Sequence, residues 1–271
     1  MTSSEAYVKH ADFPKSVAIE IVPSLTSRVE WKEGCRVIDV GCGPGNVTRE
    51  VLLPNLPKSI KTIVGIDKCP DFVKYAKIHY EWAPITSFRL MDIVDDDVPG
   101  ELEGYFDYAF SLFCFHQFHN HEAAFSNVAR MLKPAGEFLC YFPITSSSVL
   151  VYKAFAEDEK WKHYFSDYET YRSPYNESSD IKEELETMLA FVGFKICFLK
   201  VEEKKHKFYV KDFPYTCSSF GITVPDRLMD ELIEDIPAKL KSLDLIKVGE
   251  DDEEYLDYTY NLVTLHLVKN D

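Results

Sequence analysis

The sequence predicts an α/β fold, a mostly parallel sheet with helices on both faces. Seven short apolar segments have the length and composition of buried strands. Five of them alternate with helical segments between about residues 35 and 143, and the first ends in a glycine-rich turn at residues 41–45. Strands that alternate with helices form right-handed βαβ units, and these units build a parallel sheet that is covered on both sides.

Five strands and three helices make up the predicted core, residues 35–143. The strands are CRVIDVG (35–41), TIVGIDK (62–68), SFRLMDIV (87–94), YFDYAFSLFCFH (105–116) and GEFLCYF (136–142). The first helix covers 46–56, with Asn46 as its cap and Pro54 at its end or bend. The second covers 70–80 and is opened by Pro70, and the third covers 121–134 and is stopped by Pro134.

The segments around this core are predicted from their periodicity. Residues 1–34 are expected to form a helical lid, because 14–29 space their apolar residues as a helix does. Residues 144–190 and 210–255 are expected to be helical cap insertions, with helices at 180–193 and 224–243 and a solvated acidic loop at 249–257. Residues 191–209 and 256–271 are expected to hold the last two strands, all within one domain of 1–271.

Charge and cysteine content limit the predicted partners and compartment. The chain has 45 acidic and 30 basic residues and a formal net charge of −15. Nucleic acids and anionic membranes attract Lys and Arg, so neither is a predicted partner. The 7 cysteines include no CxxC pair, which favours a reducing compartment. No long apolar run and no apolar signal core occur, so a cytoplasmic protein without a membrane span is expected.

The turn DVGCGPG (39–45) favours a ligand that has no phosphate. A phosphate loop needs a lysine after its glycines, and none follows here. A dinucleotide turn has the spacing GxGxxG, whereas this turn is GxGxG with Asn46 in place of the third glycine. Asp39 suits an ammonium group, and the helix that follows Gly45 suits a carboxylate. S-adenosylmethionine carries both groups together with an adenosine.

The next strand ends supply residues for the rest of such a ligand. Asp67 ends the second strand, where a carboxylate can accept hydrogen bonds from both ribose hydroxyls. Asp92 ends the third strand and can accept from the adenine amino group. The fourth strand ends in SLFCFH (111–116), on the rim where ligands of open α/β sheets bind. Each aspartate alone could be a loop cap, and the ordered set is what predicts the cofactor.

These residues resemble the class I S-adenosylmethionine-dependent methyltransferases. VIDVGCGPG (37–45) matches the first motif of that family and VGIDKCPDFVKYAK (64–77) the second. The resemblance implies a Rossmann-like, seven-stranded, mostly parallel sheet, methyl transfer from S-adenosyl-L-methionine, and a set of cofactor-binding residues. That set is Asp39, Gly41, Cys42, Gly43, Gly45, Asp67, Lys68, Asp92, Ile93, Ser111, Leu112 and Phe113.

Longer segments, among them KWKHYFSDYETYRSPY (160–175) and DYTYNLVTLHLVK (257–269), are similar to the juvenile hormone acid O-methyltransferases of arthropods. The similarity implies methylation of the carboxylate of a small hydrophobic acid, such as juvenile hormone acid or farnesoic acid. The chain departs from that family at two positions associated with the acceptor, with Gln117 in place of Trp and Pro14 in place of Gln. A hydroxyl or amine acceptor, or a catalytically silent cofactor-binding protein, stays open as an alternative.

His116 and Gln117, at the end of the fourth strand, are the predicted catalytic and acceptor-site residues. A carboxylic acid is ionised near pH 7 and needs no general base, whereas a hydroxyl or amine usually does. His116, His119 and His121 lie close together in the sequence. They have no distant Cys or His pair, so no metal site is predicted.

Two segments are predicted to enclose the acceptor. The region around Tyr7, His10 and Phe13 is expected to close the cofactor cleft. Aromatic residues between 141 and 175 are expected either to wall the acceptor or to complete the core of the cap. They are Tyr152, Phe155, Trp161, Tyr164, Phe165, Tyr168, Tyr171 and Tyr175.

Overall fold

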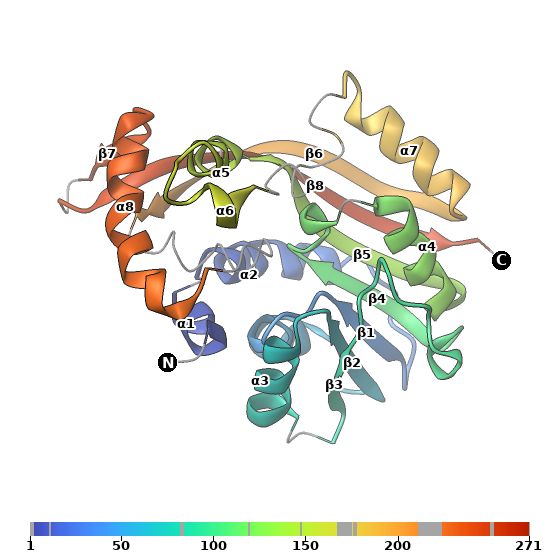
Figure 1. Cartoon of the computed structure of the whole chain (residues 1–271). Helices are drawn as coiled ribbons and strands as arrows, with labels where there is room; N and C mark the ends of the chain where they lie inside the picture. The colour runs from blue at the N-terminus through green and yellow to red at the C-terminus, as the bar shows by residue number, and fades with distance from the viewer. Residues whose placement is uncertain are drawn as a thin grey trace.

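A central sheet organises the chain in the computed structural model, which describes residues 3–10, 12–81, 84–118, 120–146, 148–166, 175, 178–210, 224–249 and 252–270 (Figure 1). Within these ranges the sheet has 8 strands in the order β3-β2-β1-β4-β5-β8-β6, with β7 paired to β8 outside this path. Pairing is parallel from β3 to β5, and β8 is antiparallel to β5, β6 and β7. The predicted α/β fold is therefore confirmed, with one short strand beyond the predicted seven.

The strands are β1 Arg36–Val40, β2 Thr62–Asp67, β3 Thr86–Leu90, β4 Phe106–Leu112, β5 Leu132–Ser146, β6 Phe194–Tyr209, β7 Ile246–Val248 and β8 Glu254–Lys269. The α-helices are α1 Ser3–His10, α2 Asp12–Thr26, α3 Pro70–Tyr80, α4 His121–Met131, α5 Ser148–Ala156, α6 Lys162–Phe165, α7 Ile181–Phe191 and α8 Met229–Ser242. Single helical turns are η1 Thr48–Leu52, η2 Leu53–Asn55, η3 Gly100–Leu102, η4 Phe115–Gln117 and η7 Asp226–Leu228.

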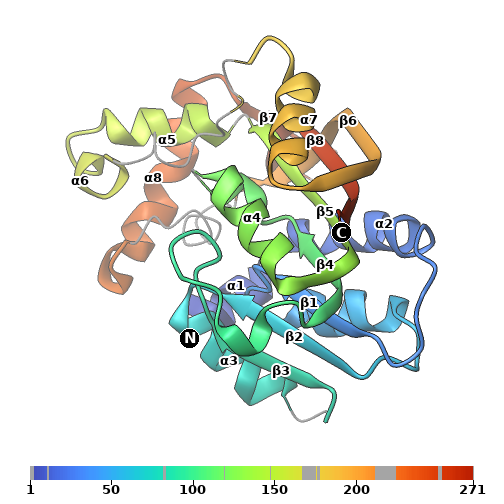
Figure 2. The ribbon, with the colours of Figure 1, turned by 90° about the vertical axis from the view of Figure 1, so that its right-hand side faces the viewer.

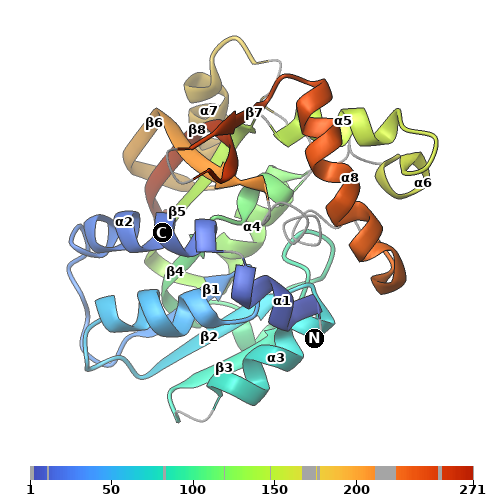
Figure 3. The same cartoon turned by 90° about the vertical axis from the view of Figure 1, so that its left-hand side faces the viewer.

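Helices cover both faces of the sheet. Figure 2 looks onto the side of α4 and α7, and Figure 3 onto the side of α1, α2 and α3. Successive strand residues point to opposite faces, so Val37 packs in the α2 and η1 layer while Ile38 packs in the α4 and α7 layer. Each β-strand of the core thus serves two hydrophobic layers.

Side-chain caps open two of the described α-helices. The side chains of Asn120 and Asp180 accept backbone N–H bonds at the starts of α4 and α7. Asn46 is not a cap. The segment predicted as one helix over 46–56 is helical over 46–55, and it continues from Asn46 and Val47 through the π-helical turn η1 into the 3-10 turn η2, which contains Pro54. Proline has no N–H to donate, which favours the end of this helical segment at Asn55, next to Pro54.

The long antiparallel pair β6 and β8 extends past the parallel part of the sheet and carries α8 at its end (Figure 1). The pairing runs from Phe194 and Lys269 to Tyr209 and Tyr255. The predicted acidic loop ends earlier than expected, because β8 begins at Glu254. The backbone from this residue on pairs with β7, and from Tyr255 on it also pairs with β6. We call α5, α6 and α8 the helical cap.

Candidate functional site

A cavity of about 340 Å³ lies at the carboxyl ends of β1, β2 and β4 and beside the residues that follow β3. Parallel strands present their carboxyl ends at one edge of the sheet, where open α/β sheets bind ligands. Most of the predicted site residues line the cavity. They are Asp39, Gly41, Cys42, Gly43, Asp67, Lys68, Asp92, Ile93, Leu112, Phe113 and Gln117.

Three predicted residues, Gly45, Ser111 and His116, are not among those that line the cavity. Ser111 is buried and its hydroxyl donates to the carbonyl oxygen of Val40 at 2.8 Å. A Cβ at Gly45 would lie 2.9 Å from Cζ of Phe88, so this glycine allows the turn to pack on β3. These contacts hold the sheet and the turn together behind the cavity.

The glycine-rich turn approaches the cavity with its backbone. Gly41 and Gly43 have φ angles of 74° and 56°, in the left-handed region that a residue with a Cβ rarely adopts. A Cβ at Gly41 would lie 2.0 Å from Sγ of Cys114, whereas a Cβ at Gly43 would meet nothing within 4 Å. Gly41 is therefore packed against the loop after β4, and the backbone of Gly43 stands open.

Asp67 connects the end of β2 to this turn. Its Oδ2 accepts the N–H of Gly43 at 2.8 Å and its Oδ1 accepts the N–H of Cys69 at 2.9 Å. Burial raises the pKa of this carboxyl, and the two backbone hydrogen bonds oppose the increase. A carboxylate oxygen can accept a second hydrogen bond. Asp67 can therefore hold the turn and still accept from two ribose hydroxyls.

Asp39 has a buried oxygen that lacks a partner. The residue is 2% exposed, and its Oδ2 accepts the hydroxyl of Thr48 at 2.6 Å. Oδ1 has no hydrogen bond within the described part of the chain. Burial raises the pKa of Asp39 to about 7, the Thr48 bond lowers it, and the charge of Asp67 raises it further. An unsatisfied buried carboxylate oxygen is costly, and a ligand ammonium would satisfy it.

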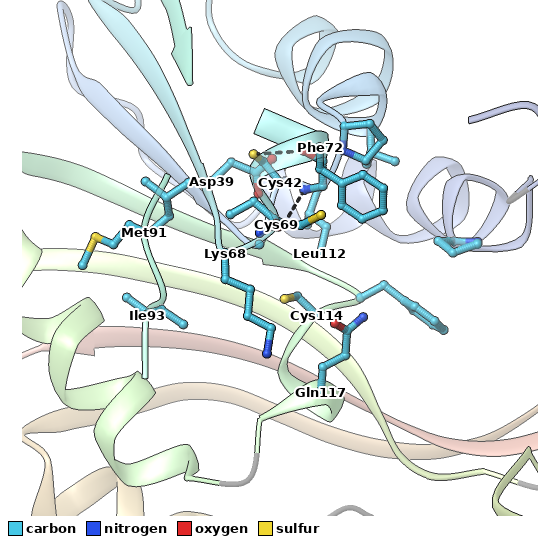
Figure 4. Close-up of a pocket in the computed structure, with 18 of the residues that line it drawn as sticks. Asp39, Cys42, Lys68, Cys69, Phe72, Met91, Ile93, Leu112, Cys114 and Gln117 are labelled. Carbon is cyan, nitrogen blue, oxygen red and sulfur yellow. Dashed lines mark hydrogen bonds between the residues drawn. The ribbon is translucent and has the colours of Figure 1, made fainter. Parts of the chain in front are cut away.

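The two ends of the cavity differ in chemistry. Figure 4 shows Met91 and Ile93 on one side and Cys114 and Gln117 on the other, with the Lys68 side chain extending between them. Asp92 lies between Met91 and Ile93, and its Oδ1 accepts the N–H of Val94 at 2.9 Å. The side near β3 therefore joins apolar side chains to a carboxylate, which suits a nucleobase.

Several lining residues have no motif that would predict them. Met91, Cys114 and Phe118 each stand next to a predicted residue, and Phe72 lies in the first turn of α3. Tyr7 from α1 also lines the cavity. The ring centroid of Tyr7 lies 5.0 Å from that of Phe72. Burial raises the pKa of Tyr7, and the negative charge of Asp67 adds a smaller increase. Met91 and Cys114 closely follow the ends of β3 and β4, and this position is the sequence signal that would have predicted them.

His116 lies behind the cavity wall. Its ring centroid is 5.2 Å from that of Phe113, and the residue is 9% exposed. Burial lowers the pKa of His116 to about 3, with a smaller contribution from His121. The ring is therefore neutral at pH 7. Gln117, by contrast, lines the cavity, and so does Pro14, so both departures from the hormone-acid family lie at this site.

His121, one of three histidines that are close together in the sequence, is buried and held by two other residues. Both ring nitrogens of His121 are engaged, with the Tyr175 hydroxyl at 3.1 Å and the Phe115 carbonyl oxygen at 2.8 Å. No group of three His, Cys, Asp or Glu side chains that could hold a metal occurs among the residues described. His119 lies outside those residues.

The aromatic residues of the cap belong to the hydrophobic core that also contains Phe13, Tyr258 and Tyr260. Phe155 stacks on Phe165 with ring centroids 5.0 Å apart, and Trp161 donates from Nε1 to Asp235 at 2.8 Å. Tyr152, Phe155, Trp161 and Phe165 are at most 3% exposed, and none of them lines the cavity. Tyr168 and Tyr171 lie outside the described residues, and so does the side chain of His10.

These features fit S-adenosylmethionine. The unpartnered Oδ1 of Asp39 suits its ammonium group, the remaining acceptor capacity of Asp67 suits its ribose, and Met91 to Ile93 suit its adenine.

Within the described residues, no helix combines the length and apolar content that a membrane crossing requires.

Comparison with known sequences agrees with this fit. Residues 38–140 match the family of methyltransferase domains. The juvenile hormone acid O-methyltransferase of Bombyx mori is 26% identical over 99% of this chain and 98% of its own length. The enzyme of the same name from Drosophila melanogaster is 28% identical over 92% of this chain and 86% of its own length.

Solved structures share the fold. A candidate methyltransferase from Bacillus halodurans superposes with a TM-score of 0.59 at 18% identity, covering 93% of this chain and 100% of the other. A phosphoethanolamine N-methyltransferase of Haemonchus contortus, in complex with S-adenosylhomocysteine, gives a TM-score of 0.52 at 17% identity. That alignment covers 100% of this chain and 61% of the other.

Proposed function

The chain belongs to the S-adenosylmethionine-dependent methyltransferases, and from this premise we propose that it methylates the carboxylate of a small hydrophobic acid. When bound, the cofactor supplies a methyl group on a positively charged sulfur. Two relatives that match nearly the whole chain carry the name juvenile hormone acid O-methyltransferase, which supports an acid of that kind.

The chemistry of the cavity at the end of β4 carries the proposal. Among the described residues, the lining there consists of Leu112, Phe113, Cys114, Gln117 and Phe118, which include no His, Asp or Glu. Burial raises the pKa of the Cys114 thiol well above its usual value, so the thiol stays protonated. His116 stands behind Phe113 and has a pKa of about 3, so it is a weak base. A hydroxyl or ammonium acceptor must lose a proton, whereas a carboxylate is already ionised near pH 7.

Gln117 is the polar group that we assign to the acceptor. Its amide can donate hydrogen bonds to a carboxylate oxygen. Phe113 and Phe118 can keep water from the reacting atoms and hold the acceptor in line, and such positioning can supply most of the acceleration. His116 packs on Phe113 and would act as a positioning residue for that ring.

A matched set of acceptors tests the proposal. The intact protein is incubated with methyl-labelled cofactor and an acid, an alcohol or an amine of the same carbon skeleton, for example farnesoic acid, farnesol and farnesylamine. We expect label in the acid product only, and we expect alkali to release it as methanol, because esters hydrolyse and ethers and N-methyl groups do not.

Other outcomes would point to the alternatives. Alkali-stable label in the alcohol or amine product would contradict carboxylate methylation and favour a hydroxyl or amine acceptor. Binding of S-adenosylhomocysteine in a calorimeter, without label transfer to any member of the set, would favour a cofactor-binding protein that is catalytically silent.

A further inference from the structure

Five aromatic rings meet beside the cavity, and we call them the aromatic cluster. Phe13 of α2 is at the centre, with its ring centroid 5.3 Å from Phe113, 4.3 Å from His206, 5.3 Å from Tyr258 and 5.6 Å from Tyr260. Phe13 is 8% exposed. The cluster thus joins the N-terminal lid, the loop after β4 and the arm formed by β6 and β8.

The cluster touches the cavity through Phe113. Phe113 lines the cavity and has a φ of 61°, a left-handed conformation that is rare for a bulky residue. Its N–H donates to the carbonyl oxygen of Tyr141 at 2.8 Å, which fixes the turn. Pro14, next to Phe13 in α2, lines the cavity as well. The rings of Phe13 and Phe113 therefore separate the cavity from the interior of the arm.

The strand order places this cluster on the side from which an acceptor would approach. Asp92 and Asp67 lie at the ends of β3 and β2, and Asp39 and Leu112 at the ends of β1 and β4. With the nucleoside at the aspartates of β2 and β3, the reactive end faces β4. The strands beyond β4 are β5, β8 and β6, and the last two carry Tyr260, Tyr258 and His206.

The aromatic cluster is mostly apolar, and the ring of Phe13 fills the space between the other rings. Its members are hydrocarbon rings, two phenols and His206, whose pKa is lowered by burial, so the imidazole is neutral at pH 7. A hydrocarbon tail would be compatible with these surfaces, but the phenyl ring of Phe13 occupies the space between Phe113 and the two tyrosines.

We propose that Phe13 is a specificity-determining residue, whose ring ends the apolar side of the acceptor site and limits the length of the acceptor tail. The proposal rests on the proposed transfer of a methyl group to a small apolar acceptor. It predicts that removal of the ring shifts the preference of the native chain toward longer tails.

The test compares tail lengths in Phe13→Ala, Phe13→Leu and the native protein. For butanoate, octanoate and dodecanoate we measure kcat/KM and also the Kd in the presence of S-adenosylhomocysteine. Each buried methylene contributes roughly 0.8 kcal/mol, which corresponds to about a fourfold change in affinity. We expect Phe13→Ala to raise the dodecanoate to butanoate ratio at least about tenfold, with Phe13→Leu between the two.

A matched control separates this effect from a general loss of packing. Phe72 is likewise 8% exposed, but it lines the cavity directly and belongs to α3 on the nucleoside side. Phe72→Leu should weaken cofactor binding and leave the ratio between acids unchanged. A ratio within twofold of native in Phe13→Ala, in protein that binds S-adenosylhomocysteine normally, would overturn the role of Phe13. An equal change of that ratio in Phe72→Leu would do the same.

The test remains distinct from that of the proposed function. If the native chain methylates alcohols or amines instead of acids, the carboxylate assignment fails. A series of alcohols or amines with the same three tail lengths then measures how kcat/KM depends on tail length and decides the role of Phe13.

Discussion

The two sides of the site are built from different kinds of contact. Around the glycine-rich turn, directional hydrogen bonds fix the geometry, as between Asp67 and Gly43 and between Asp39 and Thr48. On the side of β4 and the arm, Phe13 and its neighbouring rings meet through aromatic ring contacts. Directional bonds restrict a position to few residue types, whereas apolar contacts tolerate exchanges that keep volume. The cofactor side is therefore constrained, and the acceptor side is free to diverge.

The largest expected effect is on the cofactor side, at Gly41. In Gly41→Ala the new Cβ would lie 2.0 Å from Sγ of Cys114, and the left-handed backbone adds about 1–2 kcal/mol of strain. We expect the affinity for S-adenosylhomocysteine, measured by calorimetry, to fall at least about 100-fold, which is roughly 2.7 kcal/mol.

Gly43→Ala is the matched control, because it imposes the same kind of backbone strain where a Cβ meets nothing within 4 Å. It should lose no more than about tenfold in affinity. Adding Cys114→Gly to Gly41→Ala removes both clashing atoms and should recover most of the loss. Equal losses in the two alanine variants would mean that strain alone, and no close packing, accounts for the glycines.

A smaller effect is expected at Asp67. Asp67→Ala removes the acceptor of the Gly43 and Cys69 N–H groups and of the predicted ribose bonds. We expect cofactor affinity to fall by about 1–3 kcal/mol, because polar groups lose their partners. Thermal unfolding without ligand should report the part of this loss that belongs to the turn. An unchanged cofactor affinity would contradict the ribose assignment.

The pH dependence of the ligand-free protein should report Asp39. Its pKa rises from 3.8 to about 7 on folding, so the folded state binds the proton more tightly than the unfolded state does. The associated stability is complete below about pH 4 and is lost as the pH rises through about 7. The native protein should therefore lose about 2 kcal/mol more than Asp39→Asn between pH 5 and pH 8.

Asparagine at this position keeps an acceptor for the Thr48 hydroxyl and does not titrate, so the difference isolates the carboxyl group. The measurement is thermal unfolding of both proteins at several pH values. If their stabilities change with pH in parallel, the pKa of Asp39 is not raised on folding, and a buried, unpartnered carboxylate does not explain the cofactor side.

The smallest effect on the cofactor is expected on the acceptor side. Gln117→Trp places a large ring in the cavity lining next to Phe118 and should alter the relative kcat/KM of the acids. The Kd for S-adenosylhomocysteine should stay within about threefold of native, because Gln117 lies across the cavity from Met91 and Ile93. A native acceptor profile would remove Gln117 from the acceptor site. A large change in cofactor affinity would contradict the separation of the cavity into a cofactor side and an acceptor side.

Sequence reasoning succeeded where local chemistry and strand order act together. The alternation of strands and helices gives the order of the elements, and the edge formed by their carboxyl ends follows from it. Asp39, Asp67 and Asp92 could be placed at one cavity for this reason. The helix expected at 46–56 is present over 46–55 with π and 3-10 turns, and only the end of the loop expected at 249–257, from Glu254, is a strand, because pairing with β6 and β7 extends β8.

Tertiary structure alone decided which aromatic residues stand near the acceptor. The sequence contains 19 Phe and 16 Tyr residues, and spacing cannot show which of them enter a core. The rings of the cap pack on each other, while Phe13, Phe113, Tyr258 and Tyr260 meet from three distant segments. The burial of His116, which makes it a weak base, likewise became visible only in the folded chain.

By itself, then, the sequence determined the methyl donor, because glycine spacing and aspartates at strand ends are local patterns that fix a backbone shape and a set of hydrogen-bond acceptors. Only the tertiary structure decided that Asp67 also holds the turn, that Asp39 keeps an unpartnered oxygen, and that Phe13 packs on Phe113. The physical reason is that burial and contact between residues far apart in the chain are properties of the packed molecule, and residue order specifies them only through the fold.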